Sequence, residues 1–417
     1  MPKFVIEEPR KLSGSISVQG AKNSSLPILA STILCGDTCV LHNCPRLSDV
    51  ETCVRILRYL GAEVTRDETT LTVNTKNINR YDIPDELMRG MRSSIIFLGA
   101  ILARVGRAEL SLPGGCDLGI RPIDLHIKAM KLLGAKVKGY CGKIDCETPN
   151  GIIGAKVALE IPSVGATENA MICATLAKGT TIITNSAREP EICDLADFLN
   201  ACGAKISGAG EGTIYIDGVE KLSGCQHTII PDRIVATTYM SATAITGGSV
   251  ELTNIVPTHL SAVIPVFEEI GCTIKVNGNK LYLKAPYELK NIKLIRTMPY
   301  PGFPTDAQAP LLALATVCNG TSLFVENIFD SRYKHVSELI RLGANIKVEG
   351  KVAIVNGVKK LYGTKVEAQD LRGGASLVVA GLIAEERTEI KGIKHIERGY
   401  ENLELNLTSI GANIKKI

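Results

Sequence analysis

Hydrophobic residues along this chain follow a helical period that gives way, again and again, to the alternation of strands. One helical face is formed by Leu47, Val50, Val54, Leu57 and Leu60. Ser48 and Glu51 have the spacing of a capping box, and Gly61 predicts the end of the helix. Stretches such as KLYLKAP, which begins at residue 280, alternate as half-buried strands do.

The same pattern occurs six times. Its marker is a glycine flanked by small residues and followed by a β-branched residue, as in LGAEV, LGAKV, CGAKI, IGCTI, LGANI and IGANI. The marker glycines are Gly61, Gly134, Gly203, Gly271, Gly343 and Gly411, so the spacings are 73, 69, 68, 72 and 68 residues. A helix that runs into a short strand recurs as well (CGDTCVLHN, KGTTIITNS, GGSVELTNI, NGTSLFVEN). The sequence therefore predicts an α/β chain of six modules, each with a helix, a strand, a helix and two strands.

The first helix of each module is predicted to begin at a related position. The count runs back from the residue that begins the first short strand of each module, which is a glycine in five modules and Glu386 in the sixth. Going back 13 residues in the first module and 14 in the others gives Asn23, Arg92, Gly165, Arg233, Asp306 and Arg372. Second helices are expected to begin near Arg121, Arg188, Arg332 and Arg398. Helix N-termini attract anions, so the repeated placement indicates a substrate with more than one phosphate or carboxylate. One such arginine alone is more often a cap or a surface charge.

A candidate nucleophile lies in the stretch SLPGGCDLGIRPIDLH, residues 111–126. A Pro-Gly-Gly turn precedes Cys116, and Arg121-Pro122 is expected to open a helix just beyond it. A guanidinium group and a helix N-terminus both favour the thiolate form of a nearby cysteine. The alternative is an inert thiol, because the chain has 13 cysteines and most free cysteines only fill space.

Composition narrows the function classes. The 417 residues are 45% apolar, enough for a large core in two or more domains. With 47 basic and 43 acidic residues, 4% aromatics and no tryptophan, a nucleic-acid binder is disfavoured. No signal peptide or membrane span is expected, so we predict a soluble cytoplasmic protein. Cys35, Cys39 and Cys44 lie near His42, but this spacing matches no familiar zinc pattern, so they are interpreted as structural.

Several motifs together resemble one family over essentially the full length. They are QGAKNSSLPI around Lys22 and Asn23, the Cys116 loop, FPTDAQAP around Asp306, DLRGGASLVVAG around Arg372 and ERGYENLE around Arg398. This set is similar to the UDP-N-acetylglucosamine 1-carboxyvinyltransferases. The resemblance implies two inside-out α/β barrel domains, each with three βαβαββ repeats and with its helices inside. It places residues 22–230 in one domain and residues 1–21 with 231–417 in the other, with substrate bound between them under the cysteine loop.

The resemblance also implies an activity and roles for individual residues. The enolpyruvyl group of phosphoenolpyruvate would pass to the 3'-hydroxyl of UDP-N-acetylglucosamine with release of phosphate, the first committed step of peptidoglycan synthesis. Cys116 would act as general acid and form a covalent adduct with phosphoenolpyruvate, and Asp306 would act as base. From the residues alone Asp306 could equally be a plain N-cap. Lys22, Arg121 and Arg398 would hold phosphoenolpyruvate, with Asn23 beside Lys22.

Other positions match those that hold the UDP-sugar in the family: Arg92, Arg121, Pro122, Ile123, Asp124, Leu125, Ser163, Val164, Gly165 and Ile328. Asp370 and Arg372 match a pair near the reacting centre, although a structural salt bridge would look the same in sequence. Arg332 and Glu189 are expected to be scaffold or lobe-contact residues. No metal or cofactor is implied. A cysteine at position 116 implies covalent inhibition by the epoxide fosfomycin.

Two alternatives remain at this stage. The 3-phosphoshikimate 1-carboxyvinyltransferases share the six-unit architecture and the phosphoenolpyruvate site but lack the cysteine loop. A ring of six α/β units could instead encircle nucleic acid without catalysis, which the near-neutral charge disfavours.

Overall fold

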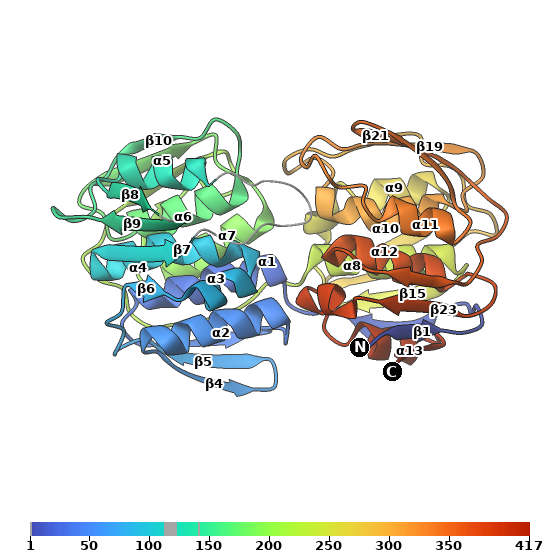
Figure 1. The fold of residues 1–417 in the computed structure, drawn as a ribbon, viewed down its shortest axis with the longest axis horizontal. Coiled ribbons are helices and arrows are strands. Elements are labelled where there is room, and N and C mark those ends of the chain that lie inside the picture. Colours follow the sequence, from blue (N-terminus) through green and yellow to red (C-terminus); the bar gives the residue numbers. More distant parts are fainter. Residues whose placement is uncertain (1, 112–122, 141) are drawn as a thin grey trace. The chain divides into compact units, whose positions relative to one another are not determined.

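The structure is a computed structural model of the chain, and it describes residues 2–111, 123–140 and 142–417. These residues form two compact units (Figure 1). Unit A comprises the described residues between Gly20 and Ile230, and unit B comprises the residues up to Gln19 together with Pro231–Ile417. The described residues form six four-stranded sheets, three in each unit, and each sheet has one parallel and two antiparallel strand pairs. The predicted α/β class is therefore confirmed.

The three sheets of unit A share one strand order. The first is β14 (Gln226–Thr228), β3 (Thr38–His42), β5 (Thr70–Asn74) and β4 (Glu63–Asp67). The second is β6 (Asp82–Ile83), β7 (Arg107–Ser111), β9 (Lys143–Glu147) and β8 (Lys136–Tyr140). The third is β10 (Lys156–Ala158), β11 (Thr180–Thr184), β13 (Thr213–Asp217) and β12 (Lys205–Ser207).

Unit B repeats this order. Its sheets are β2 (Ser13–Ser17), β15 (Ser249–Thr253), β17 (Lys280–Lys284) and β16 (Thr273–Asn277); β18 (Ile295–Arg296), β19 (Thr321–Val325), β21 (Val352–Asn356) and β20 (Asn345–Glu349); and β22 (Lys365–Glu367), β23 (Thr388–Lys391), β1 (Phe4–Ile6) and β24 (Ile414–Lys416). In every sheet the first-named strand runs parallel to the second.

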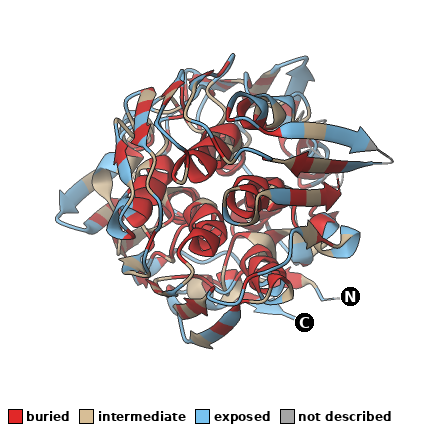
Figure 2. Cartoon of the chain, turned by 90° about the vertical axis from the view of Figure 1, so that its left-hand side faces the viewer, coloured by how far each residue is buried: buried red, intermediate tan, exposed pale blue. Residues whose placement is uncertain are grey.

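The helices of unit A form an inner and an outer set. The inner helices are α1 (Lys22–Ser31), α4 (Phe97–Val105) and α6 (Val164–Ala174), and α4 packs against the other two. The outer helices are α2 (Ser48–Leu60), α5 (Asp124–Leu132) and α7 (Pro190–Ala201), and the short helices are η1 (Thr32–Leu34), α3 (Asp85–Gly90) and η2 (Arg92–Ile96). Residues 166–174 of α6 are all buried, as expected for a helix surrounded by protein. Figure 2 shows the buried helices inside and half-exposed strands outside.

Unit B has the same arrangement. Its inner helices α8 (Arg233–Ile245), α10 (Thr305–Ala315) and α12 (Leu371–Gly381) pack against one another. The remaining helices are η3 (Pro257–Leu260), α9 (Ile264–Glu269), α11 (Val336–Arg341), η4 (Ile393–Arg398) and α13 (Leu403–Ser409). Residues 234–245 of α8 are all buried. The hydroxyl groups of Thr237, Ser241 and Thr243 donate hydrogen bonds to the backbone carbonyls four residues earlier. None of the helices among the described residues has the length and apolar character needed to cross a bilayer.

The marker glycines do what the pattern predicts. Gly61 follows α2 in the left-handed region with φ +107°, and the other five also have positive φ between +96° and +105°. The predicted apolar face of α2 is buried throughout. The capping box is wrong, because α2 begins at Ser48 itself and Leu47 is its N-cap residue, with no side-chain hydrogen bond. Glu51 instead forms an ion pair with Arg66.

Three strands, β14, β1 and β2, complete sheets whose other strands are distant in sequence. β14 pairs with β3. The last strand of unit A in sequence is therefore the edge strand of the sheet formed by the first three strands of that unit. β1 lies between β23 and β24, and β2 lies beside β15. Unit B is therefore closed by residues that precede unit A in the chain.

Candidate active site

Helix starts carry the predicted site residues in both units. Arg92 and Arg233 are the first residues of η2 and α8, while Asn23, Gly165, Asp306 and Arg372 are the second residues of α1, α6, α10 and α12. The expectation for the second helices is wrong for Arg332 and Arg398. Arg332 lies four residues before α11, and Arg398 is the last residue of η4. Arg332 lies in turns that precede α11, and Arg398 lies in a short 3-10 helix that precedes α13, where the repeat pattern predicted the first residue of a helix.

Asp306 in unit B is held by two buried guanidinium groups. Arg332 Nη2 lies 2.9 Å from Asp306 Oδ1, and Arg372 Nη2 lies 3.2 Å from Asp306 Oδ2. Both arginine side chains are 2% exposed, whereas the Asp306 side chain is 28% exposed. Asp306 is not an N-cap, since Pro304 occupies that position in α10. The carboxylate is therefore placed by charge and remains open to solvent on one side.

Asp370 and Arg372 do not form the salt bridge that was the structural alternative for this pair. Asp370 is the N-cap residue of α12, and its Oδ1 accepts hydrogen bonds from the backbone N–H groups of Arg372 and Gly373. The Arg372 guanidinium turns to Asp306 and lies 5.4 Å from the centre of the Tyr400 ring. Arg332, expected to be a scaffold or lobe-contact residue, forms an ion pair with the Asp306 carboxylate.

Several buried polar atoms around Asp306 have no hydrogen-bond partner among the described residues. They are Arg332 Nε, Asp370 Oδ2 and both ring nitrogens of His335. Burial lowers the pKa of His335 to about 4, so the ring is neutral at physiological pH. Buried polar groups are almost always paired in native proteins, so such a group of unpaired atoms indicates a place for a polar ligand.

Glu326 organises the segments beside Asp306 and was missed in the sequence. It is fully buried, its Oε2 accepts a hydrogen bond from the Thr305 hydroxyl at 3.0 Å, and its Oε1 accepts one from the Ile328 backbone N–H at 2.8 Å. Ile328 itself is 39% exposed. One carboxylate thus ties the first turn of α10 to the loop that carries Ile328.

The segment after Arg398 packs against the start of α12. A Cβ added at Gly399 would lie 2.8 Å from Leu371 Cδ2, so only glycine fits this approach without a shift. The amide of Gln19 donates to the Gly399 carbonyl at 3.2 Å, and its Oε1 accepts from the Glu401 N–H at 2.8 Å. Arg398, half-buried, is therefore held close to the first turn of the helix that carries Arg372.

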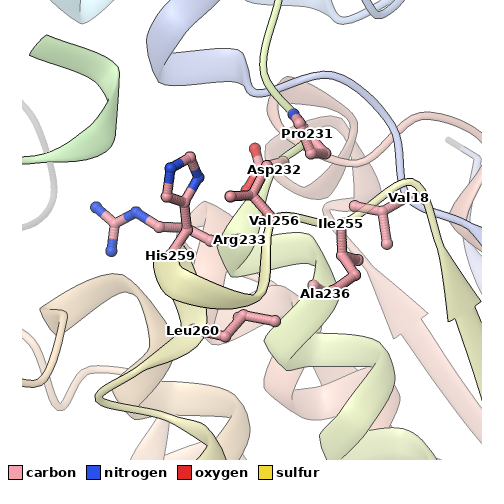
Figure 3. Close-up of a pocket in the computed structure, with 9 residues that line it drawn as sticks. All are labelled: Val18, Pro231, Asp232, Arg233, Ala236, Ile255, Val256, His259 and Leu260. Atoms are coloured by element: carbon pink, nitrogen blue, oxygen red, sulfur yellow. The ribbon is translucent and has the colours of Figure 1, made fainter. Parts of the chain in front are cut away.

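A small recess lies at the start of α8 (Figure 3). Asp232 caps this helix through the backbone N–H groups of Ile234 and Val235, and the Arg233 and His259 side chains lie on one side of the recess. Its space of about 170 Å³ includes open solvent, well below the volumes of roughly 300–1,000 Å³ that hold ligands of drug size. We therefore do not identify the recess with a nucleotide site.

Lys22 opens α1 in unit A and is 9% exposed. Its Nζ lies 2.8 Å from Asp49 Oδ2, and Asp49 is 1% exposed at the start of α2. Asn23, the next residue, is half-buried. Pro27 follows Asn23 by four residues, and Pro310 follows Asp306 by four. Proline has no N–H, so the Asn23 and Asp306 carbonyls do not receive the usual helix bond from that position.

Asn169 joins the remaining segments predicted for the UDP-sugar. Its amide nitrogen donates to the Ile95 carbonyl and lies 2.8 Å from His126 Nδ1, and its Oδ1 accepts from the Gly99 N–H. These contacts connect the middle of α6 to the last turn of η2, the first turn of α4 and the first turn of α5. His126, just after Ile123, Asp124 and Leu125, is buried, which lowers its pKa to about 4. A Cβ at Gly165 would lie 3.1 Å from its ring, so the segment Ser163, Val164 and Gly165 adjoins the start of α5.

Some predicted residues cannot be placed. Cys116, Arg121 and Pro122 lie outside the described residues, and so does the side chain of Arg92. Glu189, expected to be a scaffold or lobe-contact residue, is the half-buried N-cap residue of α7 without a side-chain capping bond.

Comparisons with known proteins place the fold in a class. The family model described as EPSP synthase (3-phosphoshikimate 1-carboxyvinyltransferase) matches residues 6–407. The enolpyruvyl transferase NikO from Streptomyces tendae superposes with a TM-score of 0.90 over 100% of this chain and 98% of its own, at 24% identity. EPSP synthase from Acinetobacter baumannii gives a TM-score of 0.77 over 100% of both chains, at 18% identity. The fold and the family match define an enolpyruvyl transferase.

Curated relatives narrow the class. UDP-N-acetylglucosamine 1-carboxyvinyltransferase 2 of Caldanaerobacter subterraneus subsp. tengcongensis is 48% identical over 417 residues, which is 100% of both chains. UDP-N-acetylglucosamine 1-carboxyvinyltransferase 1 of Carboxydothermus hydrogenoformans is 48% identical over 100% of this chain and 99% of its own. The enzyme of that name from Finegoldia magna is 45% identical over 420 residues. The chain belongs to the UDP-N-acetylglucosamine 1-carboxyvinyltransferase family.

Proposed function

We propose that this protein transfers the enolpyruvyl group of phosphoenolpyruvate to the 3'-hydroxyl of UDP-N-acetylglucosamine and releases inorganic phosphate. The observation that carries the proposal is full-length identity of 45–48% to curated relatives with that name. The geometry adds an ion-paired, partly exposed carboxylate at Asp306 and buried cations at Lys22, Arg332 and Arg372, which suit a substrate pair rich in carboxylate and phosphate.

The reaction sets three demands on the protein. The acceptor oxygen forms a bond to C2 of phosphoenolpyruvate and loses its proton, while C3 gains a proton. When the C2–O bond to phosphate breaks, C3 gives up a proton and the enol ether forms again. An acid and a base must therefore act near the two carbons, and cations must hold the carboxylate and the departing phosphate.

Cys116 and Asp306 are the proposed proton-transfer groups. Cys116 delivers the proton to C3 and forms the covalent adduct that the family resemblance implies. Asp306 accepts the hydroxyl proton. Its ion pairs to Arg332 and Arg372 support this role, because they hold the carboxylate in one orientation on the first turn of α10. Glu326 acts as a positioning residue through Thr305.

Cationic groups from different modules hold the substrates in this proposal. Lys22, Arg121 and Arg398 bind the carboxylate and phosphate of phosphoenolpyruvate, and Asp49 orients the Lys22 ammonium. Asn23 lies beside Lys22 on α1. Asp370 leaves Oδ2 unpaired near the start of α12, where it can accept a hydrogen bond from substrate. Arg372 stabilises the Asp306 carboxylate.

The UDP-sugar is proposed to contact a second set of residues: Arg92, Arg121, Pro122, Ile123, Asp124, Leu125, Ser163, Val164, Gly165 and Ile328. Support comes from Asn169 in α6, whose side chain bonds the Ile95 carbonyl in η2 and contacts His126 in the first turn of α5, so these three elements are tied together. Helix N-termini present free N–H groups to phosphate oxygens. In this proposal the activity serves peptidoglycan synthesis in the cytoplasm, and the charge on the substrates is balanced by side chains and helix N-termini.

Phosphate release with two acceptors tests the proposal. With phosphoenolpyruvate, we expect phosphate in the presence of UDP-N-acetylglucosamine and none above background with shikimate 3-phosphate. Cys116→Ser should lose turnover while its circular dichroism spectrum and unfolding midpoint stay native. Phosphate release with shikimate 3-phosphate alone would overturn the choice of acceptor.

Fosfomycin labelling tests the assignment of Cys116. Burial raises the pKa of Cys146, Cys173, Cys272 and Cys318 to about 12, so these thiols stay protonated and weakly reactive at neutral pH. We therefore expect no adduct on these four thiols. From the family resemblance we expect inactivation to accompany an adduct on the peptide that contains Cys116. Inactivation with the adduct on another cysteine would contradict the assignment.

A further inference from the structure

Four cysteines that are far apart in sequence gather inside unit A. The Sγ atoms of Cys35, Cys39 and Cys202 all lie within 4.8 Å of one another, and Cys225 Sγ lies 3.3 Å from Cys202 Sγ. All four are free thiols in the structure. Cys35, Cys39 and Cys202 are buried and Cys225 is partly exposed. We call this group the four-cysteine cluster.

Regular backbone positions hold the cluster together. Cys35 follows η1 at the end of the first inner helix, Cys39 is in β3, and Cys202 follows α7. Cys225 directly precedes β14, whose Gln226 pairs with Val40, so the ladder places Cys225 beside Cys39. The Val40 N–H donates to the Cys225 carbonyl at 2.9 Å, and the Ser223 N–H donates to the Cys202 carbonyl at 2.9 Å. The thiols therefore converge because the fold fixes the backbones that carry them.

Cys225 Sγ contacts Cys202 Sγ but is not one of the three sulfur atoms that all lie within 4.8 Å of one another. Cysteines that only fill space do not need sulfur atoms brought together from four separate segments of unit A.

We propose that Cys35, Cys39, Cys202 and Cys225 bind a single zinc-type divalent metal ion in a structural all-thiolate site. With Zn–S bonds of about 2.3 Å, tetrahedral geometry puts the sulfur atoms about 3.8 Å apart. The Sγ atoms of Cys35, Cys39 and Cys202 lie within 4.8 Å of one another, and Cys225, 3.3 Å from Cys202, would complete the set by a small shift of its side chain toward the other two. Soft thiolate ligands in a closed set of four select zinc over magnesium or calcium. No local cysteine spacing revealed the site, because two ligands lie near each end of unit A.

Metal binding at this site would have a defined chemistry and a structural effect. Each thiol that is still protonated gives its proton to solvent as its sulfur bonds to the metal, so no oxidant or reductant is needed. The ion would join η1 and β3 to α7 and to the segment before β14, and so lock the sheet in which the end of unit A meets its beginning. The cluster follows the end of the inner helix that Lys22 opens, roughly 20 Å away at 1.5 Å per residue. The ion would therefore be structural and would not touch substrate.

Metal analysis and cobalt substitution test the proposal. The full-length protein, produced with zinc and purified under reducing conditions, should contain about one zinc ion per chain. Replacement by Co²⁺ should give thiolate-to-cobalt charge-transfer bands and the strong visible bands of tetrahedral cobalt. Cys39→Ser and Cys202→Ser should retain less than about a tenth of the metal, and Cys225→Ser should weaken cobalt binding at least about tenfold.

Cys318→Ser is the matched control. This buried cysteine of unit B lies outside the cluster, so its variant should keep native metal content and cobalt bands. Cobalt titration of the native protein does not depend on the folding of any variant. The proposal is overturned if that protein binds neither zinc nor cobalt, if bound cobalt lacks thiolate bands, or if mass spectrometry shows disulfides among the four cysteines after reducing purification.

Discussion

Asp306 forms ion pairs with Arg332 and Arg372, which lie 26 and 66 residues away in sequence and could not be predicted as its partners. Two guanidinium groups that are 2% exposed need a nearby negative charge, because an uncompensated buried charge is costly. Asp306 supplies it from the first turn of α10. The carboxylate therefore has a structural duty as well as the proposed catalytic one, and a useful experiment must separate the two.

Asp306→Asn makes this separation. The amide keeps the shape but cannot accept a proton, so we expect kcat for phosphate release to fall at least about 100-fold. Loss of the charge beside Arg332 and Arg372 should also destabilise the fold by about 3 kcal/mol, measured by urea unfolding. Asp330→Asn is the control, since Asp330 is 89% exposed and should change neither quantity. An Asp306→Asn enzyme with native kcat would exclude Asp306 as the base.

At the residue scale, the sequence located helix-start residues better than their partners. Asp306 and Arg372 could be found because they occupy equivalent positions in repeated modules. Arg332, Asp49 and Glu326 could not be assigned, because each reaches its partner through the course of a connection or a neighbouring helix. Whether Asp370 forms a salt bridge with Arg372 or caps α12 through the backbone could not be decided from the sequence, because both arrangements use the same residues.

The inner helices of unit A meet where α4 has a glycine. A Cβ at Gly99 would lie 2.5 Å from the backbone oxygen of Asn169 and 2.8 Å from its Oδ1. The Gly99 N–H also donates to Asn169 Oδ1 at 2.8 Å. The close approach of α4 and α6 and the position of the Asn169 side chain, which also contacts η2 and α5, therefore depend on the absence of a side chain at Gly99.

Gly99→Ala should part these two helices. We expect a loss of about 2–4 kcal/mol in the free energy of unfolding, because backbone and a packed amide must move. The KM for UDP-N-acetylglucosamine should rise more than that for phosphoenolpyruvate. Gly139→Ala is the control, since its Cβ would meet no atom closer than 4.0 Å and the change should stay within about 0.5 kcal/mol. If Gly99→Ala matches this control, the helices have more room than the structure gives them.

Helix ends were easier to predict than helix beginnings. A left-handed residue after a helix favours glycine, so Gly61 and its five counterparts reveal the ends directly. The start of α2 was missed because the Leu47 carbonyl already accepts the Glu51 N–H, which places Ser48 inside the helix. Capping motifs shift by one residue when the backbone alone can begin the turn.

Across the whole molecule, two buried histidines make stability depend on pH. His126 in unit A and His335 in unit B both have a pKa lowered to about 4 from 6.5, mainly by burial. The folded protein keeps the rings neutral. Below pH 6.5 the unfolded chain takes up protons that the folded chain cannot, so stability is lost as the pH falls from 6.5 toward 4.

Urea unfolding at two pH values measures this effect. Between pH of about 7.5 and about 5, each histidine should remove about 2 kcal/mol from the free energy of unfolding. His126→Asn should be less stable than the native protein at neutral pH but should lose about 2 kcal/mol less on acidification. Equal acid sensitivity in the two proteins would show that His126 does not titrate in the way its burial implies.

For the whole molecule, the six-module repeat could be predicted from the sequence, but the pairing of β1 and β14 with distant strands could not. Marker glycines spaced about 70 residues apart gave six modules. β1 and β14 have three residues each, too few for any periodicity, and their partners lie hundreds of residues away in sequence. The four-cysteine cluster was hidden for the same reason, because it forms only when β14 returns to β3.

The position of β1 also sets an order of events on the ribosome. Every strand of the unit A sheets is encoded within one continuous stretch, so that unit can complete its hydrogen bonding soon after residue 230 leaves the exit tunnel. Phe4–Ile6 must wait for β23 and β24, which are synthesised last. Translation that stops early would thus release a chain with one finished half and an N-terminal strand whose partners were never made, a substrate for quality-control proteases.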